Sequence, residues 1–589
     1  MHNFPGTGNG RITSWGAVTR YFPLLALLAT IVALRAGESQ ELQWAVRAGG
    51  VGVDTPTRVA VDQDGNTYLT GGFSETATFG PSEANQTTLV SAGNTDIFVA
   101  KFASNGALVW AKRAGGIGED AGIGIAVDKA GNSYVAGRIR NVATFGPGEP
   151  NQTVITSPGT AAIFAAKFDP DGMLVWVTYA GGVGLDQGLG IGVDGEGNSY
   201  VSGGFSETAT FGLGEANQTE LISAGGPDFF LAKYDPDGAL VWAVRAGGAG
   251  GDSGRAAADE HGNVCACGVF MEVATFGYGE PNETTLVSGG HWDIFVARYD
   301  SSGKLRWAKR AGGAGSDQGI GIAVDGEGGC FVTGVIAEAA VFAPGEANQT
   351  ILMAEGSWDT FVARYDSNGV LHWVKQITGP AAIGGVGIAT DWAGNSAVSG
   401  YFLGTATFAP GEGNQTTLTS FGNLDVFVAK YETGGGLAWV KRIGGPGPDQ
   451  GAGVVFDSVG KIRVTGSFSE TITFGAGETN ETELTSTGGQ DIFLAMYGAS
   501  AGPSIEGLID EITGLQDQGI LAPGLESALI EKLEAAAASL GRGNVNAAAG
   551  QLRAFTNQVS ALLRSGQLPA GAGQSLIDAA NQILSACCS

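Results

Sequence analysis

The sequence contains few of the residues that build most catalytic and metal centres. Only four histidines occur among its 589 residues, and His261, His291 and His372 are far apart in the chain. Zinc-ligand patterns, nucleophile elbows, phosphate-binding loops and dinucleotide fingerprints are all missing. Carboxylates are numerous, so an enzyme that cleaves glycans with Asp or Glu stays open.

Cysteine is also scarce, and five scattered cysteines are too few for a disulfide framework. Cys265, Cys267 and Cys330 replace other residues within strand-like segments, so we expect small, buried, hydrophobic side chains there. Cys587 and Cys588 are adjacent near the C-terminus, where pairing with each other and pairing with a partner are both open.

Long apolar runs are missing except at residues 21–34, which follow Arg11 and Arg20 and precede small residues around Ala36. This order is typical of a secretory signal peptide. An uncleaved anchor is the alternative, although a run of about 14 residues is short for a membrane span. We therefore predict that residues 1–36 are a signal peptide. The mature chain would then be secreted, extracellular or at the cell surface, with no membrane span.

Positive charge is in short supply, because 31 Lys and Arg face 58 Asp and Glu, for a formal net charge of −27. Such a surface repels nucleic acid and anionic membranes. The charge therefore favours cations or basic partners and argues against a nucleic-acid partner.

Glycine, in contrast, is abundant, with 100 residues that follow no three-residue period. They are interleaved with β-branched and aromatic residues, which argues against both collagen and disorder. The composition therefore predicts an ordered all-β structure with many tight turns.

The chain is built from a repeat whose motif tryptophans are 65 or 66 residues apart. These are Trp44, Trp110, Trp176, Trp242, Trp307, Trp373 and Trp439. Each unit contains an inner run such as "GIGIAVD", then "SYVAGRI", a long loop, a segment such as "DIFVAKF", and finally the Trp strand. Four-stranded units repeated radially are the pattern of a β-propeller.

The two ends of the repeat are offset. The first Trp strand, "LQWAVRAGG" at residues 42–50, lacks the preceding "DIFVAKF" segment, and the last such segment, "DIFLAMY", lacks a Trp strand after it. We predict that residues 42–50 complete the blade built by residues 452–497. This pairing would close a ring of seven blades over residues 37–500 and cover two exposed sheet edges.

The segments "GGIGEDAGIGIAVDKAGNSYVAG" and "DIFVAKFASNGALVWAKRAGG" resemble the bacterial seven-bladed β-propeller repeat family, often labelled SBBP. The resemblance covers about residues 41–500. It implies the fold but no activity, because none is shared across that family. A longer loop, "ATFGPGEPNQTVITSPG", departs from the family pattern in every unit.

Residues 501–589 differ in composition, with less Gly, more Ala and Leu, and apolar residues at helical spacing. Pro523, Pro569 and Asn544 stand where helices would begin, so we predict a small helical bundle. The segment "GLESALIEKLEAAAASLGRGNVNAAAGQLRAFTNQVSALL" resembles the FIMAH domain. That C-terminal module of secreted bacterial proteins has no established chemistry.

Six aspartates occupy equivalent positions in the loops that join one unit to the next, with Ile383 in the seventh position. They are Asp54, Asp120, Asp186, Asp252, Asp317 and Asp449. Carboxylates gathered at one channel mouth could hold Ca²⁺ or another hard cation. We favour the alternative that each caps backbone N–H groups of its own loop, because features repeated in every blade usually serve the blade.

Two adjacent units break the symmetry, because Trp292 and Trp358 precede the third strand, with His291 beside the first. Exposed on the loop face, they could stack on a sugar ring or a peptide side chain, between polar walls formed by the neighbouring Glu and Asn residues. The alternative is that they pack onto neighbouring loops. The repeated Glu and Asn tips are interpreted as turn chemistry, or as glycosylation sites in a eukaryote.

The sequence thus predicts a secreted or cell-surface, non-catalytic binding scaffold whose partner is an extracellular glycan or protein. The alternative is an extracellular propeller hydrolase or lyase that acts on polysaccharide. Near-identical blades favour the scaffold, because an active site needs differentiated loops. No cofactor is expected apart from the Ca²⁺ that the aspartates would hold.

Overall fold

The computed structural model describes residues 40–499, 505–517, 520–542 and 544–588. The predicted signal peptide therefore lies outside the described residues. The chain divides into two compact units, one spanning Leu42–Gly498 and one that includes the residues from Ala499 onward. Among the described helices, none combines the length and apolar character that a membrane span needs.

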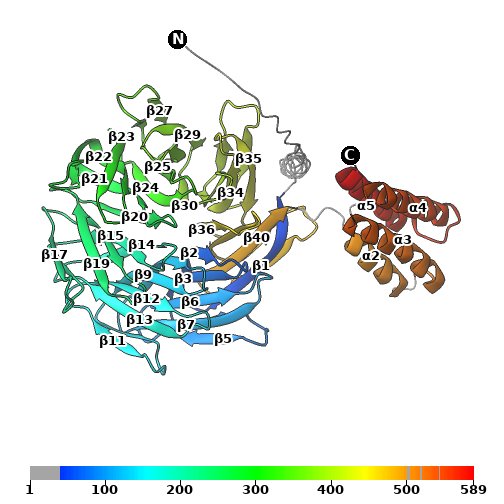
Figure 1. The fold of residues 1–589 in the computed structure, drawn as a ribbon, viewed down its shortest axis with the longest axis horizontal. Coiled ribbons are helices and arrows are strands. Elements are labelled where there is room, and N and C mark those ends of the chain that lie inside the picture. Colours follow the sequence, from blue (N-terminus) through cyan, green and yellow to red (C-terminus); the bar gives the residue numbers. More distant parts are fainter. Residues whose placement is uncertain (1–39, 500–504, 518–519, 543, 589) are drawn as a thin grey trace, which may run out of the picture. The chain divides into compact units, whose positions relative to one another are not determined.

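The first unit consists of antiparallel sheets in which the same four-stranded order recurs (Figure 1). The innermost strands are β2 (Asp54–Val61), β8 (Ala121–Val127), β14 (Gln187–Val193), β20 (Ser253–Ala258), β24 (Gln318–Val324), β30 (Ile383–Thr390) and β36 (Gln450–Phe456). The second strands are β3 (Thr67–Phe73), β9 (Ser133–Ile139), β15 (Ser199–Phe205), β21 (Val264–Phe276), β25 (Cys330–Ile336), β31 (Ser396–Phe402) and β37 (Ile462–Phe468).

The third strands are β6 (Asp96–Phe102), β12 (Ala162–Phe168), β18 (Asp228–Tyr234), β22 (Thr284–Tyr299), β28 (Asp359–Tyr365), β34 (Asp425–Tyr431) and β40 (Asp491–Ala499). The fourth strands carry the motif tryptophans and are β7 (Leu108–Gly116), β13 (Leu174–Ala180), β19 (Leu240–Ala246), β23 (Leu305–Gly313), β29 (Leu371–Thr378), β35 (Leu437–Ile443) and β1 (Gln40–Gly50). The N-terminal strand β1 lies beside β40, in the order β36-β37-β40-β1.

The innermost strands contact one another in a cycle. Each packs beside the next along the chain, and β36 packs beside β2. The second and third strands are buried almost throughout, because sheets on both sides cover them. This arrangement is that of a propeller, with glycine-rich strands around a central cavity.

Tryptophans of the fourth strands tie most units to the next one. Trp110 Nε1 donates to the carbonyl oxygen of Pro170 at 3.0 Å, and its ring lies against Gly172. Gly172 has a φ of +80°, and a Cβ there would lie 2.8 Å from the indole ring. The glycine of this turn is thus required both by its backbone conformation and by the neighbouring ring.

The segment expected to be a long loop between the second and third strands is mainly a β-hairpin, which corrects the sequence interpretation. The separate hairpins are β4 (Thr76–Phe79) with β5 (Thr87–Val90), β10 (Val142–Phe145) with β11 (Thr153–Thr156), β16 (Thr208–Phe211) with β17 (Thr219–Ile222), β26 (Ala339–Phe342) with β27 (Thr350–Met353), β32 (Thr405–Phe408) with β33 (Thr416–Thr419), and β38 (Thr471–Phe474) with β39 (Thr482–Thr485). In the remaining unit the hairpin is not separate, because the long strands β21 and β22 extend into it.

Each hairpin pairs with the fourth strand of the preceding unit or with the glycine directly after that strand. In the second unit, Ala143 pairs with Gly116 and Thr144 with Gly115, at the end of β7. Phe145 is buried against Phe164 of its own unit, with ring centroids 5.0 Å apart. The hairpin therefore covers the outer edge of one unit while it is anchored in the core of the next.

The repeated Glu and Asn at the hairpin tips hold the start of the fourth strand. Glu149 Oε2 accepts a hydrogen bond from Leu174 N at 2.7 Å, and Asn151 Nδ2 donates to Leu174 O at 3.1 Å. In the last unit the same pair, Glu478 and Asn480, holds Leu42 of β1 at 2.6 and 3.0 Å. The N-terminal strand is thus held by the same contacts as an internal fourth strand.

A disulfide joins Cys265 in β21 to Cys330 in β25, which corrects the expectation that both are hydrophobic core thiols. The two residues are 65 positions apart, about one repeat, and lie on facing sheets of neighbouring units. Cys267 is free and buried, as expected. The side chains of Cys587 and Cys588 lie outside the described part of the structure.

The C-terminal unit contains the helices α2 (Ile505–Asp517), α3 (Pro523–Gly541), α4 (Val545–Arg564) and α5 (Ala570–Cys588). Asn544 caps α4, because its side chain accepts a hydrogen bond from Ala547 N. The residues predicted at helical spacing form one core, which includes Leu508, Leu533 and Phe555. The helical bundle is as predicted from the sequence.

The β1 contacts predict that this strand is needed for stability. Deleting residues 40–50 is expected to expose the edges of β40 and β4, and so to cause aggregation or a large fall in Tm. The matched control replaces "LQWAVRAGG" with "LVWAKRAGG" from residues 108–116, and should melt like the parent. Thermal melting and size-exclusion chromatography measure both. A deletion variant that stays monodisperse with an unchanged Tm would contradict the role of β1.

Candidate functional site

The six predicted aspartates are buried, and each caps the backbone of its own loop. Asp120 Oδ2 accepts from Gly116 N and Oδ1 from Arg140 N, both at 2.8 Å. Asp317 makes the same contacts with Gly313 N and Ala337 N, at 2.8 and 2.9 Å. Each carboxylate thus joins the end of one unit's fourth strand to the segment after the next unit's second strand. This is the capping arrangement that the sequence offered as the alternative to a metal site.

A second aspartate, at the start of the third strand, faces the loop aspartate in most units. Asp96 accepts from Arg113 Nη1 at 2.6 Å, while its Oδ1 is buried with no hydrogen-bond partner in the described residues. A Cβ on Gly115 would lie 2.9 Å from Asp96 Oδ1 and 3.1 Å from Asp120 Oδ2. The two carboxylates therefore flank one glycine, with no room for a side chain between them.

Five units contain such a pair of facing carboxylates. The pairs are Asp54 with Asp491, Asp96 with Asp120, Asp228 with Asp252, Asp293 with Asp317, and Asp425 with Asp449. Asp186 lies opposite Ala162 instead, and in the unit of Asp359 the loop position is occupied by Ile383. The sequence analysis missed these partners, although the Asp that opens the "DIFVAKF" segments was a visible signal.

Burial raises the pKa of the loop aspartates, and the facing carboxylate raises it further. The pKa is about 7 for Asp54, Asp252 and Asp449 and about 6 for Asp120 and Asp317. Backbone N–H donors oppose both effects without cancelling them. The pairs can therefore take up protons near neutral pH.

The aspartates do not form a metal centre with one another in this structure. Within the described ranges, no group of three or more His, Cys, Asp or Glu side chains is arranged to hold a metal ion. The carboxylates also already accept hydrogen bonds from their own loops. The arrangement does not fit a shared cation site, and Ca²⁺ binding stays an untested prediction.

Trp292 and Trp358 are exposed, at 36% and 41% of their surface. The Trp292 carbonyl oxygen accepts from Asp317 N at 2.7 Å, and that of Trp358 from Ile383 N at 3.0 Å. Both tryptophans therefore lie at matching positions beside the loops that bear the aspartates. His291 is exposed next to Trp292.

A third aromatic side chain, Phe421, lies in the following unit, four residues before Asp425, whereas the tryptophans directly precede the corresponding aspartates. It is 66% exposed, and the guanidinium carbon of Arg442 lies 5.6 Å from its ring centroid. The signal was present in the sequence, because the equivalent position holds Ala92, Pro158 or Ala224 in other units. We call Trp292, Trp358 and Phe421 the aromatic series.

The expectation that the neighbouring Glu and Asn side chains form polar walls beside the tryptophans is wrong. Glu280 Oε2 accepts from Leu305 N at 2.8 Å and Asn282 Nδ2 donates to Leu305 O at 3.2 Å. Leu305 pairs with Tyr299 at the far end of β22 from Trp292. These side chains therefore hold a strand at the opposite end of the sheet.

Comparison with known proteins supports both sequence resemblances. Residues 109–141 match the family model of the Beta-propeller repeat, labelled SBBP, and residues 505–585 match that of the FIMAH domain. Together with the recurring sheet order, the repeat match identifies the fold of the first unit as a β-propeller.

More distant similarities extend over most of the chain. An uncharacterized WD repeat-containing protein of Acanthamoeba polyphaga mimivirus is 22% identical over 500 residues, which is 72% of this chain and 36% of that protein. A gluconolactonase from Xanthomonas campestris has 11% identity and a TM-score of 0.25, over 77% of this chain and 100% of its own. An ulvan lyase has 9% identity and a TM-score of 0.34, over 75% and 96%. These structural likenesses carry no information about activity.

The raised aspartate pKa values predict that acidification stabilises the propeller. A carboxyl whose pKa is higher in the folded than in the unfolded state binds its proton more tightly when folded. At a pH above its folded pKa, such a carboxyl is ionised and lowers the free energy of unfolding of the protein. This loss disappears as the pH falls from the folded pKa toward the ordinary pKa of 3.8. We expect Tm to rise from pH 8 to pH 5.

Asp252→Asn together with Asp317→Asn should flatten this rise, by on the order of 5 °C over that range. The control is Asp366→Asn, because its partly exposed carboxyl has a lowered pKa and titrates below this range. Differential scanning calorimetry at each pH measures the slope. A wild-type Tm that is flat or falls on acidification would show that the pairs do not titrate as described.

Proposed function

We propose that the chain is a secreted or cell-surface protein whose residues 37–500 form a seven-bladed propeller that binds an extracellular glycan or protein without catalysis. The position of β1 beside β40 and the cyclic contacts of the innermost strands support ring closure by the N-terminal strand. Near-identical loops in most units support a scaffold rather than an active site.

The Cys265–Cys330 disulfide supports an extracellular location. Disulfides form and persist in oxidising compartments and are rare in reducing ones. This bond joins the second strands of two neighbouring units, so it links sheets that are otherwise held by packing. It agrees with the signal peptide predicted over residues 1–36.

The aromatic series carries the binding proposal. Three successive units each place one exposed aromatic side chain within the four residues before the aspartate of the third strand, whereas most motif tryptophans of the fourth strands donate to the turns of neighbouring units and are largely covered. Exposed aromatic rings are suited to stacking on sugar rings or apolar side chains. Three contacts of modest strength in a row favour an extended or multivalent ligand over a small one.

The test replaces Trp292 and Trp358 with Thr, the residue at the equivalent position 95 of the first unit. Affinity for the retained member of a panel of immobilised extracellular polysaccharides and matrix proteins should fall about thirtyfold, because two stacked rings contribute about 1 kcal/mol each. Trp392→Ala is the matched control, because Trp392 is 77% exposed but lies in a hairpin turn between β30 and β31. Tm should stay unchanged in both variants.

Full retention by the double variant would contradict the aromatic series as the binding surface. A fall in Tm typical of a core substitution would make the two tryptophans structural instead. Release of soluble sugars from a retained polysaccharide would support the polysaccharide hydrolase or lyase in place of the scaffold.

A further inference from the structure

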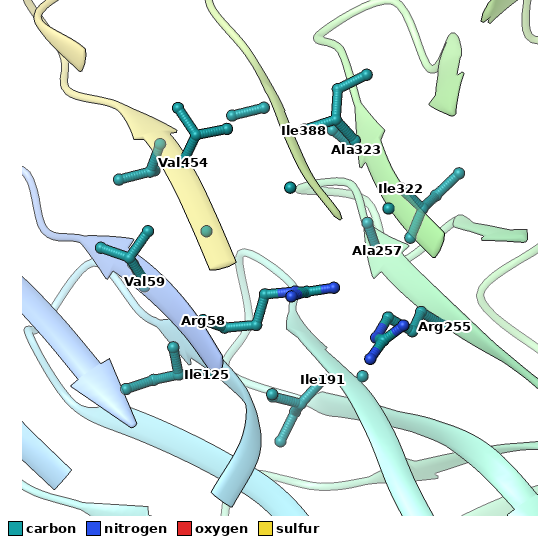
Figure 2. Close-up of a pocket in the computed structure, with 18 of the residues that line it drawn as sticks. Arg58, Val59, Ile125, Ile191, Arg255, Ala257, Ile322, Ala323, Ile388 and Val454 are labelled. Carbon is teal, nitrogen blue, oxygen red and sulfur yellow. The ribbon is translucent and has the colours of Figure 1, made fainter. Parts of the chain in front are cut away.

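The innermost strands enclose a central cavity of about 350 Å³, lined by residues from every one of them (Figure 2). Branched apolar side chains such as Ile125, Ile191 and Ile322 line part of the walls. Where each strand lines the cavity, five units contribute a glycine, namely Gly124, Gly190, Gly321, Gly387 and Gly453. The other two contribute Arg58 and Arg255.

The two arginines converge inside the cavity. Arg58 Nη1 donates to Thr57 O at 2.8 Å and to Ala452 O at 3.0 Å. Arg255 Nε donates to Leu189 O at 3.2 Å, and its Nη1 donates to Ile320 O at 3.1 Å. Arg58 Nη2 reaches the same Ile320 oxygen at 3.5 Å, so the guanidinium groups lie close together, as Figure 2 shows.

The accepting oxygens belong to residues at register irregularities of the innermost strands. Leu189, Ile320 and Ala452 each stand where the pairing with the second strand shifts by one residue. Such a bulge leaves a residue out of the ladder. The arginines thus satisfy carbonyl groups that the sheets leave free, but these neutral acceptors carry no compensating charge.

The positive charge in the cavity has no acidic partner. In the part of the chain that the structure describes, the hydrogen bonds of Arg58 and Arg255 all go to carbonyl oxygens. Burial lowers the pKa of both groups, and their mutual repulsion lowers that of Arg58 further, to about 9. Arg58 therefore stays charged at neutral pH. Burial raises the pKa of the adjacent Cys267 thiol to about 12, so the thiol is neutral and supplies no counterion.

Two like charges held close together and away from bulk solvent are costly unless an anion joins them. Arg255 also lines the cavity with an unused hydrogen-bond donor. Its Nη2 makes no hydrogen bond to the described residues. A neighbouring cavity is lined by Asp62, Asp128, Asp194 and Glu260. The three aspartates accept hydrogen bonds within their own turns, and Glu260 pairs with Lys129. The cavity is therefore a positively charged pocket in a strongly acidic protein.

We propose that this cavity binds a small organic carboxylate, with its carboxylate between Arg58 and Arg255 and its apolar body against the isoleucine walls. A planar carboxylate matches the fork of N–H donors on a guanidinium group. The apolar walls favour an organic anion over inorganic phosphate or sulfate. This site is separate from the aromatic series, so either can fail without the other.

The first test is ligand-observed NMR titration of the full chain at constant ionic strength. Butyrate should bind, and butyramide, which has nearly the same shape without the charge, should bind at least about tenfold more weakly. Inorganic phosphate should compete weakly, because it has no apolar body. Equal binding of butyrate and butyramide, or no binding of either, would overturn the proposal. Tight binding of phosphate without butyrate would do the same.

The second test locates the site. Arg58→Gln and Arg255→Gln keep hydrogen-bond donors for the carbonyl groups but remove the charge, and each should weaken butyrate binding about tenfold. Arg140→Gln is the control, because Arg140 pairs with Glu119 on the surface. Butyrate binding by either cavity variant at wild-type strength would overturn the assignment. If a variant fails to fold, the comparison of butyrate with butyramide on the wild-type protein still tests whether the protein binds a small carboxylate.

Discussion

The pairing of β1 with β40 is the constraint on which the other features depend. It places a strand from the start of the chain next to one that begins at residue 491. The tip residues Glu478 and Asn480 then hold Leu42 as they would hold an internal strand. Since β2 follows β1 directly, this pairing also brings Arg58 to the carbonyl group of Ala452 on the neighbouring innermost strand β36.

Repetition and its exceptions divide the side chains into two groups. Features present in nearly every unit, such as the capping aspartates and the hairpin tips, use their polar atoms on the backbone of the same or the next unit. Side chains that occur in only a few units face solvent or the cavity instead. The aromatic series is exposed to solvent, and Arg58 and Arg255 project into the cavity. The candidate binding functions therefore arise where the repeat is broken.

Much of the fold was predictable from the sequence, because the spacing of the tryptophans and the strand-like segments repeats with little variation. The hairpins were missed because their strands are only four residues long, as in Thr76–Phe79, and are separated by Gly-rich turns. The Cys265–Cys330 bond was also missed. Two residues one repeat apart occupy similar positions on neighbouring sheets, and only the packing of those sheets brings the two sulfur atoms together. Arg58 and Arg255 were missed although each replaces a glycine of the repeat, because only the packing of the innermost strands around one cavity brings the two side chains together.

The most direct measurement of the central claim is amide hydrogen exchange of β1, followed by mass spectrometry. Residues 42–50 and residues 108–116 have nearly the same sequence, and the second segment is the internal fourth strand β7. If β1 pairs with β40, the two segments should be protected to a similar degree, because both have hydrogen-bonded neighbours on each side. Fast exchange of residues 42–50 beside a protected 108–116 would contradict closure by the N-terminal strand.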